Sequence, residues 1–449
     1  MTSTNQNLSK IILGGLFAII TILGVLLFIN PPSIFPDPAN GFQVMRSMEM
    51  GHGFNLMVTP GQDDFSKNTS EFLTWWSPGQ YLVPYAFKLL FGVNTGQASA
   101  IVITLCQLLG LAGFYSFFKK IGFTPFISAL SILFIACQQF FVVPYVFYNG
   151  GEILFFAFIG WFLYGCIVIK STGWKLLVFV LLTGWIGFLC KTSVMWMYAG
   201  GLLFLWLKLS LPYKKISDWI RNGIWIGVPA VIAIVTIYVF FLSKGQNPAS
   251  AVAGLKLSLQ TFCYPLASPL LSGFSVDDLC HGLIYHTGKP IFTDLQAIIV
   301  LIFTAALSLW LVLTILRRVP NENYRLLVLV FYVVSIVFFS YVYLRQMTIS
   351  YEARHFRIIG LLVIPGTIYL FSQFKAPYRV LFGIIWIGIT FTSILYLAKG
   401  YSFNKNKSAH GVSGIAQEFI DQPSLDKIMA IDRQQKNATF VFVNKAIGL

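Results

Sequence analysis

Long apolar segments recur along almost the whole chain and constrain its fold more than any other feature. They fall near residues 11–29, 97–118, 123–143, 152–169, 176–190, 193–209, 223–242, 295–316, 326–344, 357–374 and 380–398. The segments are long enough for helices and lack the alternation that outer-membrane strands require. Because unpaired backbone groups are costly in hydrocarbon, we expect an all-α polytopic membrane protein with about eleven transmembrane helices.

The composition supports a membrane protein and argues against two other classes. Of the 449 residues, 57% are hydrophobic and only 10% are charged, which is too apolar for a soluble protein of this length. The formal charge of +15 could suggest a nucleic-acid partner, but the basic residues stand in short clusters between the apolar segments. Such clusters orient membrane proteins, so we expect membrane lipids and no nucleic acid as partners.

The distribution of charge predicts an orientation. Segment 11–29 follows Lys10 and has no small-residue cleavage site after it, which indicates an uncleaved anchor with a cytoplasmic N-terminus. Alternating the segments from there places nearly all Lys and Arg of the short connections on the cytoplasmic side, opposed only by Asp218 and Glu322. We therefore expect a multi-pass protein of the plasma (inner) membrane with an extracytoplasmic C-terminus. Counting 79–91 as a span would invert the later loops, so we interpret it as a re-entrant or interfacial helix.

Three regions remain outside the spans, namely residues 30–96, 243–294 and 399–449. The last is more polar than the rest and predicts a small extracytoplasmic appendage with a strand over 438–443. Residues 1–398 form the predicted transmembrane domain. Cys263 and Cys280 share the second region, where they either form a disulfide or remain two free thiols. No spacing of Cys and His resembles a zinc site.

The first outer region carries the strongest candidate for catalysis. Asp37 follows the first span by only a few residues, which holds its carboxylate near the membrane surface. There it can act as a general base or a metal ligand on a lipid-borne substrate. The alternative is a solvated aspartate between two prolines of a turn.

A second carboxylate and a basic cluster extend this candidate site. Glu152 starts the fourth span after Asn149-Gly150-Gly151, where it either faces a substrate path or caps the helix. Lys191 lies between two short apolar runs. Arg354, His355 and Arg357 precede or begin a late span, and together these four can hold a phosphate. The alternatives are snorkelling of long side chains and an ion pair between Glu352 and Arg354.

The order of these motifs resembles the GT-C superfamily of membrane glycosyltransferases, especially the protein O-mannosyltransferases and lipid A aminoarabinose transferases. The matching segments are Asp37-Pro38-Ala39-Asn40-Gly41-Phe42, Gly51-His52-Gly53-Phe54-Asn55, Ser77-Pro78-Gly79-Gln80-Tyr81, Lys88-Leu89-Leu90-Phe91-Gly92, Asn149-Gly150-Gly151-Glu152, Cys190-Lys191-Thr192 and Glu352-Ala353-Arg354-His355 with Pro365. The chain departs from that pattern at Pro38, Trp76 and Ser77. The resemblance covers residues 1 to about 400.

The resemblance implies a GT-C-like catalytic domain over 1–398 that transfers a single sugar. The donor is a polyprenyl-phosphate sugar, and the acceptor is a protein, lipid or glycan on the extracytoplasmic face, with inversion at the anomeric carbon. It implies that Asp37 and Glu152 are catalytic and that Lys191, Arg354, His355 and Arg357 bind the donor phosphate. The only cofactor left open is a divalent cation, with Asp37 and Glu152 as candidate ligands.

The resemblance also implies that three aromatic residues of the first outer region bind the sugar or the lipid head group. They are Trp75, Trp76 and Tyr81. Their alternative is simple anchoring at the membrane interface. Two other functions stay open at this point. A transporter or flippase of lipid-linked sugars would place its charges in the middle of the bundle. A structural or assembly subunit would tolerate changes at Asp37 and Glu152.

Overall fold

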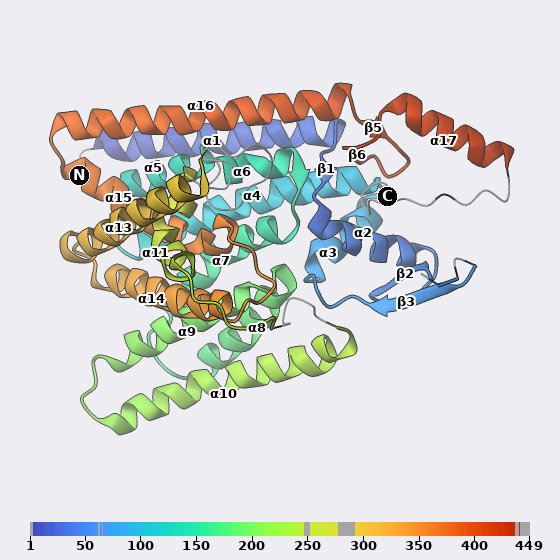
Figure 1. The fold of residues 1–449 in the computed structure, drawn as a ribbon. Helices are drawn as coiled ribbons and strands as arrows, with labels where there is room; N and C mark the ends of the chain where they lie inside the picture. The colour runs from blue at the N-terminus through green and yellow to red at the C-terminus, as the bar shows by residue number, and fades with distance from the viewer. Residues whose placement is uncertain are drawn as a thin grey trace.

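The computed structural model describes residues 3–61, 63, 64, 66–246, 252–276, 292–435 and 440. Within these ranges the chain is mainly helical (Figure 1). Cys280 lies outside the described residues, and so does the strand predicted over 438–443 except for Phe440.

All the segments predicted as spans are helical. The helices are α1 (Ser3–Ile29), α4 (Thr95–Lys120), α5 (Pro125–Ala136), α7 (Gly151–Val168), α8 (Trp174–Cys190), α9 (Val194–Ser210), α10 (Ile216–Phe240), α13 (Asp294–Arg318), α14 (Glu322–Leu344), α15 (Arg357–Gln373) and α16 (Ala376–Asn406). In the described part of the chain, eight helices are long and apolar enough to cross a membrane. A ninth span results if α5 and the helical stretch Gln139–Tyr145, bent by 69°, are counted together.

The prediction of a mainly helical, multi-pass chain is therefore confirmed, with eight or nine candidate spans among the described residues in place of about eleven. The number of candidate spans is lower than predicted because two of the predicted spans are short helices. Helices α8 and α9 have only 17 residues each, which is the lower limit for crossing the hydrocarbon core. The bend after α5 is stabilised by Gln138, whose buried Oε1 accepts a hydrogen bond from Ser275 Oγ at 2.6 Å.

One helix was not expected. Helix α11 (Leu259–Gly273) lies in the region predicted to be an outer loop, but it packs against α13, α14 and α15 within the bundle. It escapes detection because it is short and contains Pro265 and Pro269, which normally interrupt helices. Its end contacts α15 very closely, since a Cβ built on Gly360 would lie 2.5 Å from the backbone nitrogen of Gly273.

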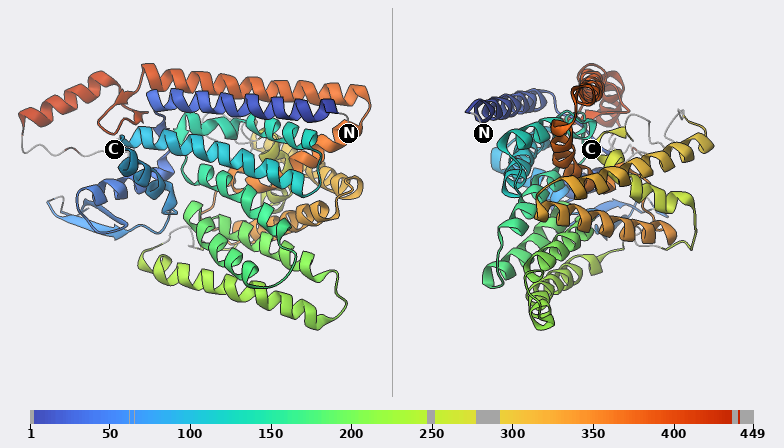
Figure 2. Two further views of the ribbon diagram at one scale, coloured as in Figure 1. Left: turned by 180° about the vertical axis from the view of Figure 1, so that it is seen from behind. Right: turned by 90° about the vertical axis from the view of Figure 1, so that its left-hand side faces the viewer.

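Successive long helices run in opposite directions along one axis, so the bundle has two distinct ends (Figures 1 and 2). One end holds basic last turns, with Lys119 and Lys120 on α4 and Arg317 and Arg318 on α13. The other end holds the beginnings of α7 and α15 and the ends of α1, α8, α14 and α16. This separation is the charge asymmetry that the sequence predicts, while the orientation in the membrane stays a prediction.

Smaller elements gather at the second end, on the right in Figure 1. They are α2 (Pro36–Glu49), the hairpin of β2 (Leu56–Pro60) and β3 (Asn68–Phe72), α3 (Gly79–Phe91), the strands β5 (Ala409–His410) and β6 (Ala416–Gln417), and α17 (Gln422–Gln434). Helix α3 is the segment predicted to be a re-entrant or interfacial helix, and its Lys88 forms an ion pair with Glu49 of α2. Helix α16 continues to Asn406, so it crosses the predicted domain boundary at 398.

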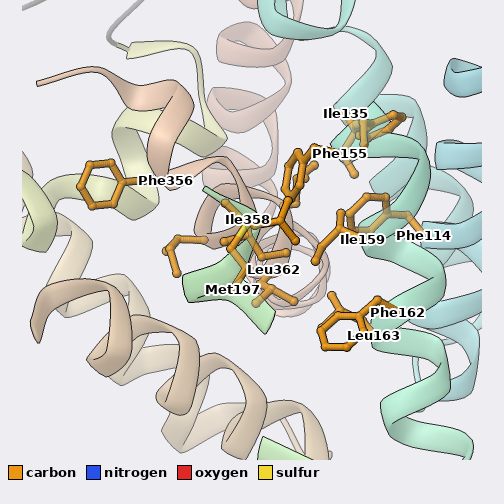
Figure 3. Close-up of a cluster of buried hydrophobic side chains, with 14 of the residues drawn as sticks. Phe114, Ile135, Phe155, Ile159, Phe162, Leu163, Met197, Phe356, Ile358 and Leu362 are labelled. Atoms are coloured by element: carbon orange, nitrogen blue, oxygen red, sulfur yellow. The ribbon is translucent and has the colours of Figure 1, made fainter. Parts of the chain in front are cut away.

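The apolar core lies where α4, α7, α9 and α15 meet (Figure 3). Phe155, Ile159 and Phe162 of α7 face Phe114 of α4 and Leu362 of α15, and all are buried. Close packing of this kind holds helices together in lipid, where apolar burial alone supplies little. The core is therefore a rigid support for the residues at the second end of the bundle.

Candidate functional site

A short parallel pair of strands brings two distant segments of the site together. Strand β1 (Ser33–Ile34) pairs with β4 (Phe147–Tyr148), and the Phe35 amide donates to the Tyr148 carbonyl at 3.1 Å. Asp37 follows the first strand and Asn149 directly follows the second. The pairing thus fixes the start of α2 beside the start of α7.

The last long helix braces this strand pair. Asn404 of α16 is buried, and its Nδ2 donates to the Val146 carbonyl at 2.8 Å. The Ser33 amide donates to the same carbonyl at 3.1 Å, so one acceptor serves both neighbours. A buried hydrogen-bonded amide resists movement because breaking it leaves polar groups without water.

Asp37 lies in the first turn of α2, next to Pro36 at the helix start. The positive end of the helix dipole favours a carboxylate at this position. Its Oδ2 accepts a hydrogen bond from Arg354 Nη1 at 2.6 Å, and the two side chains are 27% and 31% exposed. The carboxylate is thus paired with a cation and partly open to a ligand.

Arg354 lies in the 3-10 turn η4 (Ala353–Phe356), which leads into α15. Its Nε pairs with Glu352, while its Nη1 pairs with Asp37. The other carboxylate oxygen of Glu352 accepts from the Ser350 hydroxyl. Glu352 therefore holds the plane of the guanidinium from one side and leaves the opposite side to Asp37.

A second ion pair joins Glu152, in the first turn of α7, to Lys191, which ends α8. Burial lowers the pKa of Lys191, and the neighbouring Glu152 opposes this shift. The pair therefore has a cation that is readily neutralised at alkaline pH. A phosphate that approaches it offers the ammonium a further anionic partner.

These ion pairs line a cavity of about 600 Å³, which we call the main chamber. Seven of the nine site residues expected from the sequence line it, namely Asp37, Trp75, Trp76, Glu152, Lys191, Arg354 and His355. Segments from the first loop, the middle of the chain and the last third thus contribute to one wall. Such a concave site with converging polar groups is typical of a small-molecule binding site.

A second cavity of about 270 Å³ adjoins the main chamber. Five phenylalanines line it, and we call it the phenylalanine chamber: Phe35, Phe140, Phe141, Phe155 and Phe156. Asn149, Glu152 and Arg354 line both cavities. The two chambers therefore meet at the carboxylate of Glu152 and the guanidinium of Arg354.

Of the four residues predicted to bind phosphate, Arg357 is the one that lines the phenylalanine chamber but not the main chamber. Its guanidinium lies 4.0 Å from the centre of the Phe140 ring, and its Nη1 donates to the Ser272 carbonyl of α11 at 2.9 Å. The unexpected helix α11 thus positions this cation. Arg357 and Arg354 line the phenylalanine chamber together with the carboxylates of Glu152 and Glu352.

Several buried polar atoms of the main chamber have no hydrogen-bond partner among the described residues. They are Trp76 Nε1, Asn149 Oδ1, Ser193 Oγ, Trp196 Nε1 and His355 Nε2. An unsatisfied buried polar group costs about 1–3 kcal/mol, so a protein rarely keeps several of them in one place. Their concentration here indicates a polar ligand with both donors and acceptors.

Tyr81 lies apart from both chambers. It is fully buried, its hydroxyl donates to Asn55, and its ring packs against Gly41. It therefore joins α3 to α2 and the loop that precedes the hairpin. Residues that the sequence analysis did not select include Gln80, Ser193 and Trp196. Of these three, only Gln80 could have been selected from the sequence, because it belongs to the Ser77-Pro78-Gly79-Gln80-Tyr81 motif.

Within the described ranges, no group of three or more His, Cys, Asp or Glu side chains is placed to hold a metal ion. The two candidate ligands already have cationic partners, Arg354 for Asp37 and Lys191 for Glu152. This arrangement does not fit a metal site, so we derive no step through a metal.

No family model matches the chain, and no curated protein matches it. Its structure is similar to GT-C glycosyltransferases over most of its length. ArnT from Cupriavidus metallidurans, solved with undecaprenyl phosphate, has 14% identity and a TM-score of 0.46, over 83% of this chain and 62% of ArnT.

Two other solved structures are similar. Arabinofuranosyltransferase AftD from Mycobacteria has 13% identity and a TM-score of 0.43, over 94% of this chain and 30% of AftD. The oligosaccharyltransferase of Archaeoglobus fulgidus has 12% identity and a TM-score of 0.39, over 96% of this chain and 61% of that enzyme. The chain thus spans about three fifths of the ArnT and oligosaccharyltransferase chains and less of AftD.

Proposed function

We propose that this chain is a membrane glycosyltransferase that moves one sugar from a polyprenyl-phosphate donor to a hydroxyl acceptor on the extracytoplasmic face, with inversion. The observation that carries the proposal is the contact of 2.6 Å between Asp37 and Arg354 in the main chamber. Sugar transfer needs a base for the acceptor and a cation for the leaving phosphate on opposite sides of one carbon atom. Here the two groups line one cavity and are in contact, so the donor must separate them before its sugar lies between them.

The ion pairs of Arg354 support a specific way for the donor to bind. The phosphate of the donor takes the place of Asp37 on Nη1 of Arg354, while Glu352 keeps the guanidinium in position through Nε. Guanidinium groups suit phosphate because two parallel hydrogen bonds form at once. Asp37 then loses its partner and becomes available to an acceptor hydroxyl.

The reaction is one direct displacement. Asp37 takes the proton of the acceptor hydroxyl as its oxygen attacks the anomeric carbon of the sugar. The new carbon–oxygen bond forms while the bond from that carbon to the phosphate oxygen breaks. The phosphate leaves with the electron pair, and Arg354 and Lys191 stabilise the extra negative charge.

Other residues have supporting roles. Glu152 keeps Lys191 charged by opposing the effect of burial on its pKa. The indole of Trp76 and the amide of Asn149 supply an N–H donor and a carbonyl acceptor for sugar hydroxyls. The phenylalanine chamber, which Arg357 also lines, accepts the first apolar units of the donor chain. Trp75 and His355 complete the wall of the main chamber.

The test is release of polyprenyl phosphate from a panel of labelled polyprenyl-phosphate sugars, with membranes as the acceptor source. The native protein should consume one donor, and Asp37→Asn should lower its turnover by about 10²–10⁴-fold. Asp63→Asn, in the same outer region but outside both chambers, is the matched control. If no donor is consumed, or if Asp37→Asn works as well as the native protein, the proposal fails and transport of lipid-linked sugars becomes the leading function.

A further inference from the structure

A third cavity, of about 410 Å³, lies at the end of the bundle that holds the basic last turns of α4 and α13. We call it the basic-end groove. Residues of α1, α5, α15 and α16 line it, at the left of Figure 1, where the N-terminus lies and α16 begins. Helix α15 starts beside the two chambers, and the groove is lined by its last two turns. The groove is therefore separate from the candidate functional site.

The lining of the groove changes from polar to apolar along the helices. Its polar residues belong to the end of α15 and the starts of α5 and α16, and they include Thr124, Ser372, Gln373 and Arg379. Toward the middle of the bundle the lining consists of apolar residues such as Leu130 and Trp386. Trp386 follows Arg379 by seven residues, which is about 10 Å along a helix. The groove thus has the polarity of an amphiphile that enters with its head group at the end of the bundle.

The positive charge at this rim has no counter-ion within the described part of the chain. Neither Arg379 nor Lys375, the residue before α16, forms an ion pair with a described residue. Of the described acidic residues, only Asp218 and Glu322 lie at this end. Each is already beside an arginine of its own helix, at 3.2 Å and 3.9 Å. The rim is therefore suited to an anion from outside the chain.

The surroundings of the groove indicate which anion fits. Along it, α16 presents an apolar outer face, with Val380, Ile384 and Ile387 each more than 60% exposed. Such a face of a membrane-spanning helix meets lipid chains. Inside the groove, the rings of Phe371 and Phe382 stack with their centroids 4.3 Å apart. A small soluble anion pairs with the rim and leaves this apolar wall uncovered, whereas an anion with a hydrocarbon chain covers both.

We infer that the basic-end groove binds a phospholipid with an anionic head group. The head group lies at Arg379, and an acyl chain follows the apolar wall toward Trp386. Anionic lipids are attracted to basic residues near a membrane surface, and the positive ends of α5 and α16 add to this attraction. The inference does not depend on the proposed function, because no residue of the groove lines either chamber.

A lipid in this groove joins helices whose other ends reach the candidate site. Helix α15 begins with Arg357, and α5 leads through its bend to Phe140 and Phe141 of the phenylalanine chamber. Helix α16 carries Asn404, which braces the strand pair. The bound lipid therefore stabilises the bundle that supports the chambers.

The first experiment measures thermal unfolding of delipidated protein in detergent with added dioleoyl phosphatidylglycerol or dioleoyl phosphatidylcholine. The anionic lipid should raise the Tm at lower concentration than the zwitterionic one. Arg379→Gln should raise the concentration of phosphatidylglycerol at half effect about fivefold and leave the response to phosphatidylcholine unchanged. Arg318→Gln is the matched control, since Arg318 ends α13 at the same end of the bundle but does not line the groove. Equal responses to the two lipids overturn the inference, and so do equal losses in the two variants.

A second series tests the hydrocarbon chain. Inorganic phosphate and phosphatidylglycerol with six-carbon chains should stabilise the protein less than the dioleoyl lipid at the same concentration. If either stabilises it as well, the groove is a site for a soluble anion and the inference is wrong.

A matched pair of variants tests the apolar wall directly. Leu130→Trp fills the apolar part of the groove, and Ile387→Trp places the same ring on the exposed face of α16. Native mass spectrometry counts the phosphatidylglycerol molecules that stay bound to each purified protein. Leu130→Trp and Arg379→Gln should each retain one fewer than the native protein, and Ile387→Trp should retain the same number. An unchanged count in Arg379→Gln overturns the inference even if Leu130→Trp fails to fold.

Discussion

Asp37 and Arg354 form a hydrogen-bonded ion pair at 2.6 Å although 317 residues separate them in the chain. The contact joins the first loop after α1 to the turn before α15, across a cavity that also holds Glu152 and Lys191. In the proposed mechanism, each residue is the resting partner of the other until the donor phosphate replaces the carboxylate on the guanidinium.

Arg354→Lys keeps the charge but loses the two-sided contact with Asp37 and Glu352. We expect a kcat roughly 100-fold lower, because an ammonium cannot hold the phosphate and Glu352 in a fixed plane. The measurement is single-turnover transfer with saturating donor. Arg345→Lys is the control, since Arg345 caps α14 and lines neither chamber. Equal losses in both variants would contradict a specific role for Arg354.

The lowered pKa of Lys191 predicts that activity falls with rising pH while this group's contribution to folding stability rises. Burial lowers its pKa below 10.5, so kcat/KM for the donor should fall as pH rises through the lowered pKa. Between that pKa and 10.5 the unfolded chain binds more protons than the folded one, so this group makes the folded state more stable as pH rises. Lys191→Arg should move the alkaline loss of activity to higher pH and remove this contribution to stability. Rate profiles and chemical unfolding at matched pH values measure the two.

Glu152→Gln gives a complementary result. Without the carboxylate that opposes burial, the pKa of Lys191 falls further, and the alkaline loss of activity should begin at lower pH than in the native protein. The same rate profiles measure it. A profile that does not move would show that Lys191 does not contact the phosphate in its charged form.

Substitutions of Trp76 and Tyr81 distinguish a residue that binds substrate from one that stabilises the fold. Trp76→Ala should raise KM for a substrate by about tenfold, because the indole lies in the main chamber and its Nε1 is unsatisfied there. Tyr81→Phe should leave KM unchanged and cost about 1–3 kcal/mol of unfolding free energy, because Asn55 loses its buried partner. Steady-state kinetics and thermal unfolding of both variants decide between these roles.

The close contact of α11 with α15 predicts a strong effect of a single methyl group. Gly360→Ala should destabilise the protein by about 1–3 kcal/mol, since the new Cβ meets the backbone of Gly273. Gly383→Ala on α16, where a Cβ meets nothing within 4 Å, should be neutral. Thermal unfolding in detergent compares them. Equal stability would mean that the two helices do not approach as closely as described.

Much of the fold follows from hydropathy alone, because each apolar segment must be a helix in a bilayer. Helix α11 does not follow, because its two prolines and its short length remove the signal that the longer helices carry. The charged residues of the main chamber could be selected because charge is rare in this chain. The apolar residues that line the main chamber could not, since Met195 and Val334 resemble every other apolar helix residue until their neighbours are known.

The pairing of charges was only partly foreseeable. Glu352 and Arg354 are close in sequence, so their ion pair was one of the expected alternatives. The partner of Asp37 is not evident from spacing, because the two segments meet only after the bundle has formed. Tyr81 was wrongly expected in the site from its motif, because it is buried and packs between helices instead of lining a chamber.

The hydrogen bond from Asn404 to Val146 also bears on biosynthesis. Helix α16 is the last candidate span in the described chain, and it emerges from the ribosome long after the strands β1 and β4 that it braces. The strands beside Asp37 and Asn149 therefore gain this brace only when translation of the bundle is nearly complete. A chain that ends before α16 lacks the hydrogen bond from Asn404 to the strand pair.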